Sequence, residues 1–188
     1  MAFWSDPQAA KEPKRQFRFV LTLGLGGTNG TIESYFIKTV KKPSFTVGEI
    51  EHQYVSHRFY YPGRVTWNPV EVTFVDPVQP DASKILADLV VASGYNIPKT
   101  EVDSQKSLSK ALFSENIGTP QITSLDAEGN DVETWSLYNS FITNMDFGQL
   151  DYASDELVIL SMTLRYDYAT LTATSDGDSL LKPGGALG

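Results

Sequence analysis

The stretch that decides the fold is Leu157–Tyr168, LVILSMTLRYDY. One face would carry the apolar series Val158, Leu160, Met162, Leu164, Tyr166 and Tyr168, and the other Ser161, Thr163, Arg165 and Asp167. A period of two is typical of a β-strand with one buried and one wet face. We therefore expect one continuous strand here, in a sheet that is covered on its apolar side.

Further strand patterns lie on both sides of this stretch. They fall at residues 17–23, 35–40, 46–59, 69–76, 121–125, 132–138 and 141–147. Residues 126–131, DAEGND, are predicted to form a hairpin turn, and Pro62-Gly63 is predicted to form a tight turn that shapes the chain between two strands. The pattern predicts seven or eight strands.

One clear helix is predicted after Pro80. Asp81 is a suitable N-cap, because its carboxylate can accept hydrogen bonds from the first turn. The apolar residues that follow fall on one stripe, and Gly94 is placed to end the helix. A short helical turn is expected near residues 107–113. The chain is therefore expected to be mainly β, an antiparallel sandwich or barrel with one flanking α-helix.

The length of 188 residues fits a single domain. We expect an N-terminal arm at residues 1–16, a β domain at residues 17–170 and a flexible C-terminal tail at residues 171–188. Phe3 and Trp4 lie in the arm, where exposed aromatic side chains point either to an intersubunit anchor or to a free terminus.

The net charge of −8 is unevenly distributed. Residues 1–70 carry nine basic and five acidic side chains, whereas residues 71–188 carry six basic and eighteen acidic ones. An acidic protein repels phosphate, which argues against ordinary nucleic-acid binding, but an acidic surface could let DNA pass without holding it. Acidic residues kept for solubility are the alternative.

No pattern in the sequence predicts a catalytic, cofactor or metal site. There is no cysteine, so thiol chemistry and disulfides are excluded. Gly24–Gly30 lacks the Gly-Lys-Ser/Thr of a phosphate loop. His52 and His57, five residues apart on an extended segment, are expected on opposite faces, which argues against a shared metal. We expect no enzymatic activity, no apolar membrane span and no export signal.

Two segments resemble the tail tube proteins of T4-like contractile-tailed bacteriophages, of the myophage and cyanophage type. They are Tyr61–Asp76, YPGRVTWNPVEVTFVD, and Trp135–Ala169, which begins WSLYNSFITNMDFG and ends LSMTLRYDYA. The similarity covers roughly residues 17–170, in the same order and spacing. It implies the fold of contractile-injection-system tubes, a group that includes the type VI secretion tube protein.

The resemblance also implies an assembly and its partners. Six subunits would form a ring around a continuous inner β-barrel, and rings would stack into the tail tube inside the sheath. The partners would be further copies of this chain, the tail sheath protein, baseplate and tail terminator proteins, and genomic DNA that crosses the lumen unbound. The protein would be a structural component of the virion, assembled in the host cytoplasm.

The residues expected to matter are structural. Trp67 is expected to begin a strand and to anchor it, and Trp135 and Tyr166 are expected to fill the core or a subunit seam. Ser161, Thr163 and Asp167 are candidates for the lumen surface. The basic first part and the acidic remainder could meet where rings stack, so neutralising Lys41 and Lys42 is expected to weaken assembly.

Other functions remain open at this stage. The alternatives are a baseplate tube-initiator, a type VI-like secretion tube protein, and a monomeric β-barrel that binds a small apolar ligand.

Overall fold

The structure, a computed structural model, describes residues 13–23, 36–79, 81–98, 100–101, 105 and 107–173. The expectations for Phe3, Trp4 and Gly24–Gly30 lie outside these residues. The described elements, in chain order, are β1 (Phe19–Thr22), β2 (Ile37–Val40), β3 (Phe45–Tyr54), β4 (His57–Trp67), β5 (Val70–Val75), α1 (Ala82–Ala92), α2 (Lys110–Ile117), β6 (Gln121–Leu125), β7 (Asp131–Tyr138), β8 (Phe141–Asp146), β9 (Ile159–Arg165) and β10 (Tyr168–Ala173).

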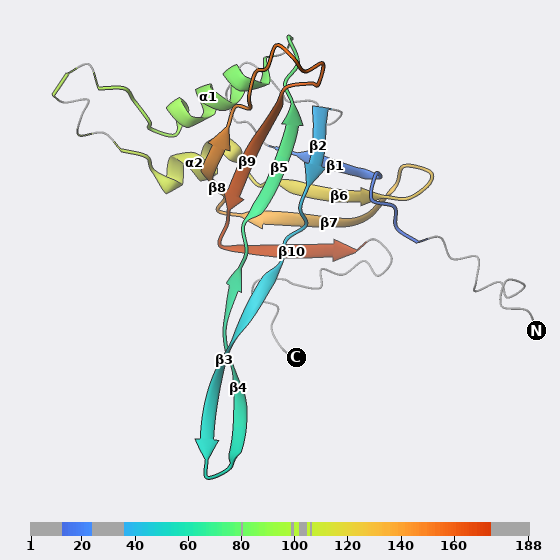
Figure 1. The fold of residues 1–188 in the computed structure, drawn as a ribbon, viewed down its shortest axis with the longest axis vertical. Coiled ribbons are helices and arrows are strands. Elements are labelled where there is room, and N and C mark those ends of the chain that lie inside the picture. Colours follow the sequence, from blue (N-terminus) through green and yellow to red (C-terminus); the bar gives the residue numbers. More distant parts are fainter. Residues whose placement is uncertain are drawn as a thin grey trace, which may run out of the picture.

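Two antiparallel sheets of four strands face each other. The order is β2-β5-β9-β8 in one, here called the β9 sheet, and β1-β6-β7-β10 in the other, called the β7 sheet. The β3–β4 hairpin is a separate two-stranded ribbon that projects far from the rest of the chain (Figure 1). The expected mainly β fold is confirmed.

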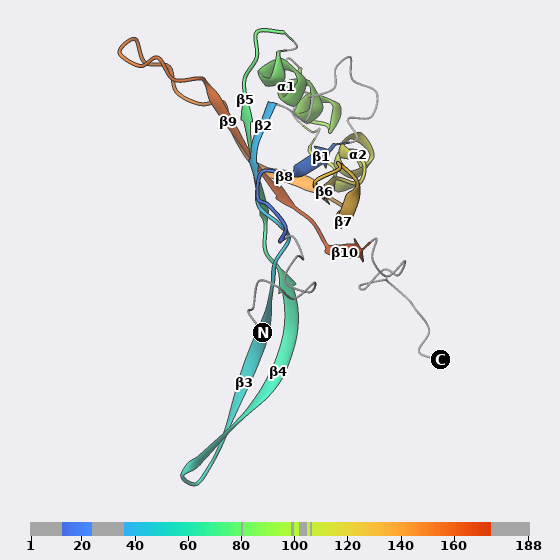
Figure 2. The same cartoon turned by 90° about the vertical axis from the view of Figure 1, so that its right-hand side faces the viewer.

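The core lies between the two sheets and the helices. Val70, Val72 and Phe74 on β5 and Leu160 and Leu164 on β9 are all fully buried. The period-two pattern therefore has the predicted phase on both strands. The helices and the β7 sheet lie on the same side of the β9 sheet (Figure 2), so its other face is not covered by any segment that the structure describes.

Helix α1 matches the prediction closely. The Asp81 carboxylate accepts a hydrogen bond from the Lys84 amide at 2.9 Å, and Leu86 and Leu89 pack into the core. Gly94 follows the helix with a φ of 106°, which favours glycine. Helix α2 was predicted only as a short turn; it is longer and begins at Lys110.

The prediction of one strand over residues 157–168 was wrong. The chain leaves the β9 sheet after Arg165 and enters the β7 sheet at Tyr168 as β10. Asp167 lies in the corner between them, where its amide donates to the Tyr138 carbonyl at 3.1 Å. Tyr166 remains buried through this corner, so the alternation of apolar residues does not reveal it.

The prediction of a turn at Pro62 and Gly63 was also wrong. Both residues lie inside β4, and the hairpin turns instead at Val55 and Ser56. The segment predicted as one strand over residues 46–59 contains that turn. The reason is that the tip has neither glycine nor proline, the residues that usually mark turns in a sequence.

Candidate functional site

The uncovered face of the β9 sheet is lined by short polar side chains, here called the polar face. In the sheet register Thr39 lies opposite Thr73, Thr73 opposite Ser161, and Ser161 opposite Asp146. A second row joins Glu71, Thr163 and Asn144. These seven residues alternate with the buried apolar residues of the same strands, so the polar face is the direct consequence of the period-two pattern.

The centre of the polar face has little capacity to hold phosphate. Five of its seven side chains are neutral hydroxyls or an amide, and the other two, Glu71 and Asp146, are carboxylates that repel an anion. Arg165 lies at one end of this face, opposite Phe141. Lys41 extends the second row beside Glu71, so the surface is wet and mostly neutral, with two carboxylates at Glu71 and Asp146 and two cations at its margins, Lys41 and Arg165.

The structure places the three lumen candidates differently. Ser161 and Thr163 belong to the polar face. Asp167 does not, because it lies in the corner after β9, where its carboxylate accepts hydrogen bonds from Lys110 Nζ at 2.7 Å and Asn139 Nδ2 at 2.9 Å. These two donors hold the pKa of Asp167 below its usual value. The expectation that Asp167 shares a strand face with Ser161 and Thr163 is thus corrected.

The β9 sheet has two open edges within the described chain. β2 is hydrogen-bonded to β5 alone and β8 to β9 alone. Since every pair in this sheet is antiparallel, β2 and β8 run in opposite directions. An unpaired edge presents free amide and carbonyl groups that can pair with another strand.

The projecting hairpin has an apolar face without a covering layer. Ile50 lies opposite Tyr61, His52 opposite Phe59 and Tyr54 opposite His57, and we call these six residues the hairpin face. Their large apolar members are exposed by about half or more: Ile50 62%, Tyr54 66%, Phe59 49% and Tyr61 55%. The opposite face is mixed, and it contains an Arg58–Glu51 ion pair at 3.3 Å. A contiguous exposed apolar surface of this kind marks a contact with another molecule.

Two glycines let the hairpin strands cross closely. A Cβ atom on Gly63 would lie 3.0 Å from the Gly48 carbonyl oxygen, tighter than an ordinary contact. Pairing shifts register at this place, between Val47 and Glu49. Gly63 therefore serves a bulge in a strand, in place of the turn that was predicted.

The tip of the hairpin is strained. Val55 has a φ of 54° and is 80% exposed. A β-branched residue in the left-handed region is uncommon, and such strain concentrates at functional positions.

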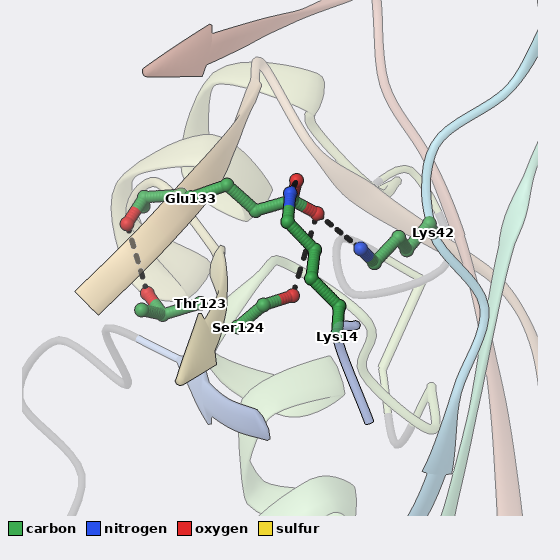
Figure 3. Close-up of polar contacts among 6 residues, drawn as sticks. Lys14, Lys42, Thr123, Ser124 and Glu133 are labelled. Atoms are coloured by element: carbon green, nitrogen blue, oxygen red, sulfur yellow. Dashed lines mark hydrogen bonds and ion pairs between the residues drawn. The ribbon is translucent and has the colours of Figure 1, made fainter. Parts of the chain in front are cut away.

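A basic cleft of about 790 Å³ opens between the edge strands β1 and β2. Its cationic residues are Lys14, Arg15, Arg18, Lys38 and Lys42, and none of the residues that line it is acidic. Glu133 on β7 lies behind it and forms ion pairs with both Lys14 and Lys42 (Figure 3). Burial raises the pKa of Glu133, but the hydrogen bonds and charges of the two lysines outweigh it, so the net pKa is lowered.

The assembly candidates Lys41 and Lys42 have different positions. Lys42 is engaged within the subunit by Glu133, and it fastens the link between β2 and β3 to the β7 sheet. Lys41 is exposed, and its amide donates to the Glu71 carbonyl at 3.0 Å, which extends the pairing of β2 with β5.

Aromatic side chains join the hairpin to the body. Trp67 ends β4, and its ring lies 5.2 Å from Phe45 and 5.9 Å from Tyr166. Tyr166 is buried, which raises the pKa of its hydroxyl. Trp135, on β7, packs half-buried against the core. Trp67 is thus at the root of the hairpin, and it does not begin the strand that follows.

The described residues contain no group of three or more metal-ligating side chains. The expectation that His52 and His57 point to opposite faces was wrong, because the hairpin turn between them brings both to the hairpin face. No helix in the described part of the chain is both long and apolar enough to cross a membrane.

Neither the hairpin face nor the basic cleft was predicted from the sequence. The cleft is assembled from segments far apart in the chain, so no local pattern marks it. The hairpin face had one usable signal, the density of aromatic residues in Tyr54–Tyr61, but without the turn at Val55 the side chains could not be assigned to faces.

Comparison with solved structures shows what the fold is. The chain is similar to a chain in the anti-feeding prophage tube terminating cap, with 19% identity over 93% of this chain and all of that one, and a TM-score of 0.63. It is similar to a chain in the anti-feeding prophage baseplate (15% identity, 87% and 97% covered, TM-score 0.63). A third similar chain is in the sheath/tube terminator of the extracellular contractile injection system PVC (17% identity, 87% and 99% covered, TM-score 0.63).

No family model matches the sequence, and no curated protein matches it. The chain has the tail-tube-like fold found in contractile injection systems.

Proposed function

We propose that this chain is a structural subunit of the inner tube of a contractile phage tail. Copies close into six-membered rings, and the rings stack into a hollow tube. The observation that carries the proposal is a polar face on a sheet with two open edges in the described chain. Such a sheet can continue from copy to copy and turn its wet face to a channel.

The strand directions support ring closure. β2 and β8 run in opposite directions, so a β8 edge placed beside the β2 edge of the next copy forms one more antiparallel pair. The same alternation then continues around the ring. Closure removes both exposed edges and with them the risk of disordered aggregation.

The hairpin supports stacking. It projects well beyond both sheets (Figure 1), and one of its faces carries four large apolar side chains that are each exposed by about half or more. A contact between unlike surfaces of successive rings propagates, which is what a tube requires.

The polar face suits a conduit for DNA. Hydroxyls and an amide hydrate most of the wall, and the carboxylates Glu71 and Asp146 offset the cations Lys41 and Arg165 at its margins, so phosphate meets little net attraction. We propose that the tube belongs to a T4-like contractile-tailed phage and works with sheath, baseplate and terminator proteins in the virion, with no reaction of its own. In this proposal an arm at residues 1–16 precedes the tube domain, which includes the whole of β10 to Ala173, so the expected boundary at residue 170 moves to residue 173.

A tube terminator or baseplate ring is the second candidate. It is supported by the similarity to chains in a tube terminating cap and in a baseplate. A terminator would form a single ring and block further growth on one side.

Electron microscopy of the purified protein tests the proposal. Long hollow tubes or stacked rings are expected. Single rings that cap other tubes would favour the terminator, and a monomer at high concentration would refute both.

A further inference from the structure

The hairpin and the loop between β8 and β9 leave opposite ends of the β9 sheet. β5 begins just after the hairpin, where Val70 lies opposite Leu164. It ends where Val75 lies opposite Ile159, the first residue of β9 after the loop. The hairpin and the loop therefore project toward opposite ends of the long axis of the molecule (Figure 1 and Figure 2). In a stack of rings that all point the same way, the hairpin end of one ring faces the loop end of the next.

The β8–β9 loop, residues 147–158, presents an uncovered apolar surface. Leu150 is 83% exposed, Leu157 is 71% exposed and Tyr152 is exposed completely. With their neighbours they surround a concavity of about 640 Å³, whose lining comes from this loop alone. This volume falls within the range of clefts that enclose a drug-sized ligand, roughly 300–1,000 Å³. The loop can therefore receive large apolar side chains.

The loop is closed at its base. Gly148 has a φ of 80°, and a Cβ atom on it would lie 2.6 Å from the Ile159 carbonyl oxygen, so only glycine fits this close approach. The Asp76 amide donates a hydrogen bond to the Val158 carbonyl at 3.0 Å, which ties the end of the loop to the segment that follows β5. A surface that is shaped before it binds loses less conformational entropy on contact.

We propose that the hairpin face of one copy docks on the β8–β9 loop of a copy in the next ring. This rests on the stacked rings proposed above, and it names the surface that receives the hairpin. The two surfaces lie at opposite ends of one subunit, so they meet only between copies. Each would cover apolar area of the other, and removing that area from water stabilises the stack.

The polar groups of the two surfaces are complementary. The loop contains Asp151, Asp155 and Glu156 and no basic residue. The hairpin face contains no carboxylate, and it carries the imidazoles of His52 and His57. An imidazole has an N–H that can donate to a carboxylate in either protonation state, so hydrogen bonds can surround the apolar contact.

Cross-linking tests the contact, because the chain has no cysteine of its own. The double variant His52→Cys with Glu156→Cys, assembled and then treated with a short bis-maleimide, should give a ladder of covalent products that continues beyond six copies. A contact between rings links copies along the tube, whereas a contact within one ring stops at the full ring.

The matched control is Gln53→Cys with Glu156→Cys, since Gln53 lies on the opposite face of the hairpin. If tubes of the first pair give no more product than tubes of the control, or a ladder that stops at six copies, this inference is overturned and the tube proposal stays intact.

Charge reversal gives a second readout. His57→Glu should raise the concentration needed for tube growth at least tenfold and leave single rings intact, because the new carboxylate would face those of the loop. His57→Glu with Glu156→Lys should restore tube growth. Reversal without effect, or a double variant no better than the single one, contradicts the docking. A wild-type protein that forms neither rings nor tubes instead contradicts the proposed function.

Discussion

Removing one aromatic side chain from the hairpin face should block tube growth without unfolding the subunit. Phe59 is 49% exposed in the isolated chain and lies opposite His52. Full burial of a phenylalanine stabilises by about 1.5–3 kcal/mol, so covering the exposed half is worth about 1 kcal/mol per copy. With six copies in each ring-to-ring contact, Phe59→Ala should cost about 6 kcal/mol, or roughly 10⁴-fold in the concentration needed for stacking.

The assay is sedimentation of assembled protein over a concentration series, with negative-stain images of the pellet. Tyr60→Ala is the matched control, because Tyr60 is 58% exposed on the same strand but faces the other side of the hairpin. Both variants should keep the wild-type unfolding temperature, since the hairpin lies outside the core. If Phe59→Ala assembles as readily as Tyr60→Ala, the hairpin face is not the stacking surface.

Three further outcomes are expected. Gly63→Ala should destabilise hairpin pairing by about 1–3 kcal/mol, because the added Cβ would press on the Gly48 carbonyl. Gly48→Ala is the control, since its Cβ would make only ordinary contacts. Hydrogen exchange of the hairpin amides should be faster in the first variant than in the second, and equal protection would contradict the close crossing of the strands. Glu133→Gln should destabilise the subunit by about 1–3 kcal/mol at pH 7 in chemical denaturation. Because the pKa of Glu133 is lowered by folding, its stabilisation is present above the unfolded pKa of 4.5 and is lost as the pH falls through the folded pKa. Glu133→Gln should therefore lose less stability on acidification than the wild-type protein. An equal loss of stability in both proteins would contradict this role of Glu133. Thr73→Lys should leave tubes intact but make them retain DNA in a gel-shift assay, whereas the control Thr73→Gln should not. DNA retention that the lysine does not increase would argue against a lumen position for Thr73.

The parts of the fold that follow from local pattern were predictable. β5 and β9 alternate with the expected phase, and α1 begins at the expected cap, because burial of one face fixes a period of two or 3.6. The predictions were wrong where the chain changes direction between elements. The corner at Asp167 and the tip at Val55 contain neither glycine nor proline, so the sequence pattern predicted one continuous strand at each place.

The functional surfaces were predictable only in part. Ser161 and Thr163 were assigned to one wet face because they lie on one strand, whereas the polar face as a whole depends on the register of four strands. The basic cleft joins Lys14 to Lys42 through Glu133, residues separated by 119 and 91 positions from that carboxylate. Contacts at such separations arise from the packing of the two sheets, which no local pattern encodes.

The most direct test of the account is a cryo-EM map of the assembled protein at a resolution that traces the strands. The account predicts a hollow assembly whose inner wall is one continuous antiparallel sheet, with β8 of each copy hydrogen-bonded to β2 of the next and Thr73 and Ser161 facing the channel. A map in which these edges are paired within each copy, or in which those side chains face away from any channel, would contradict it.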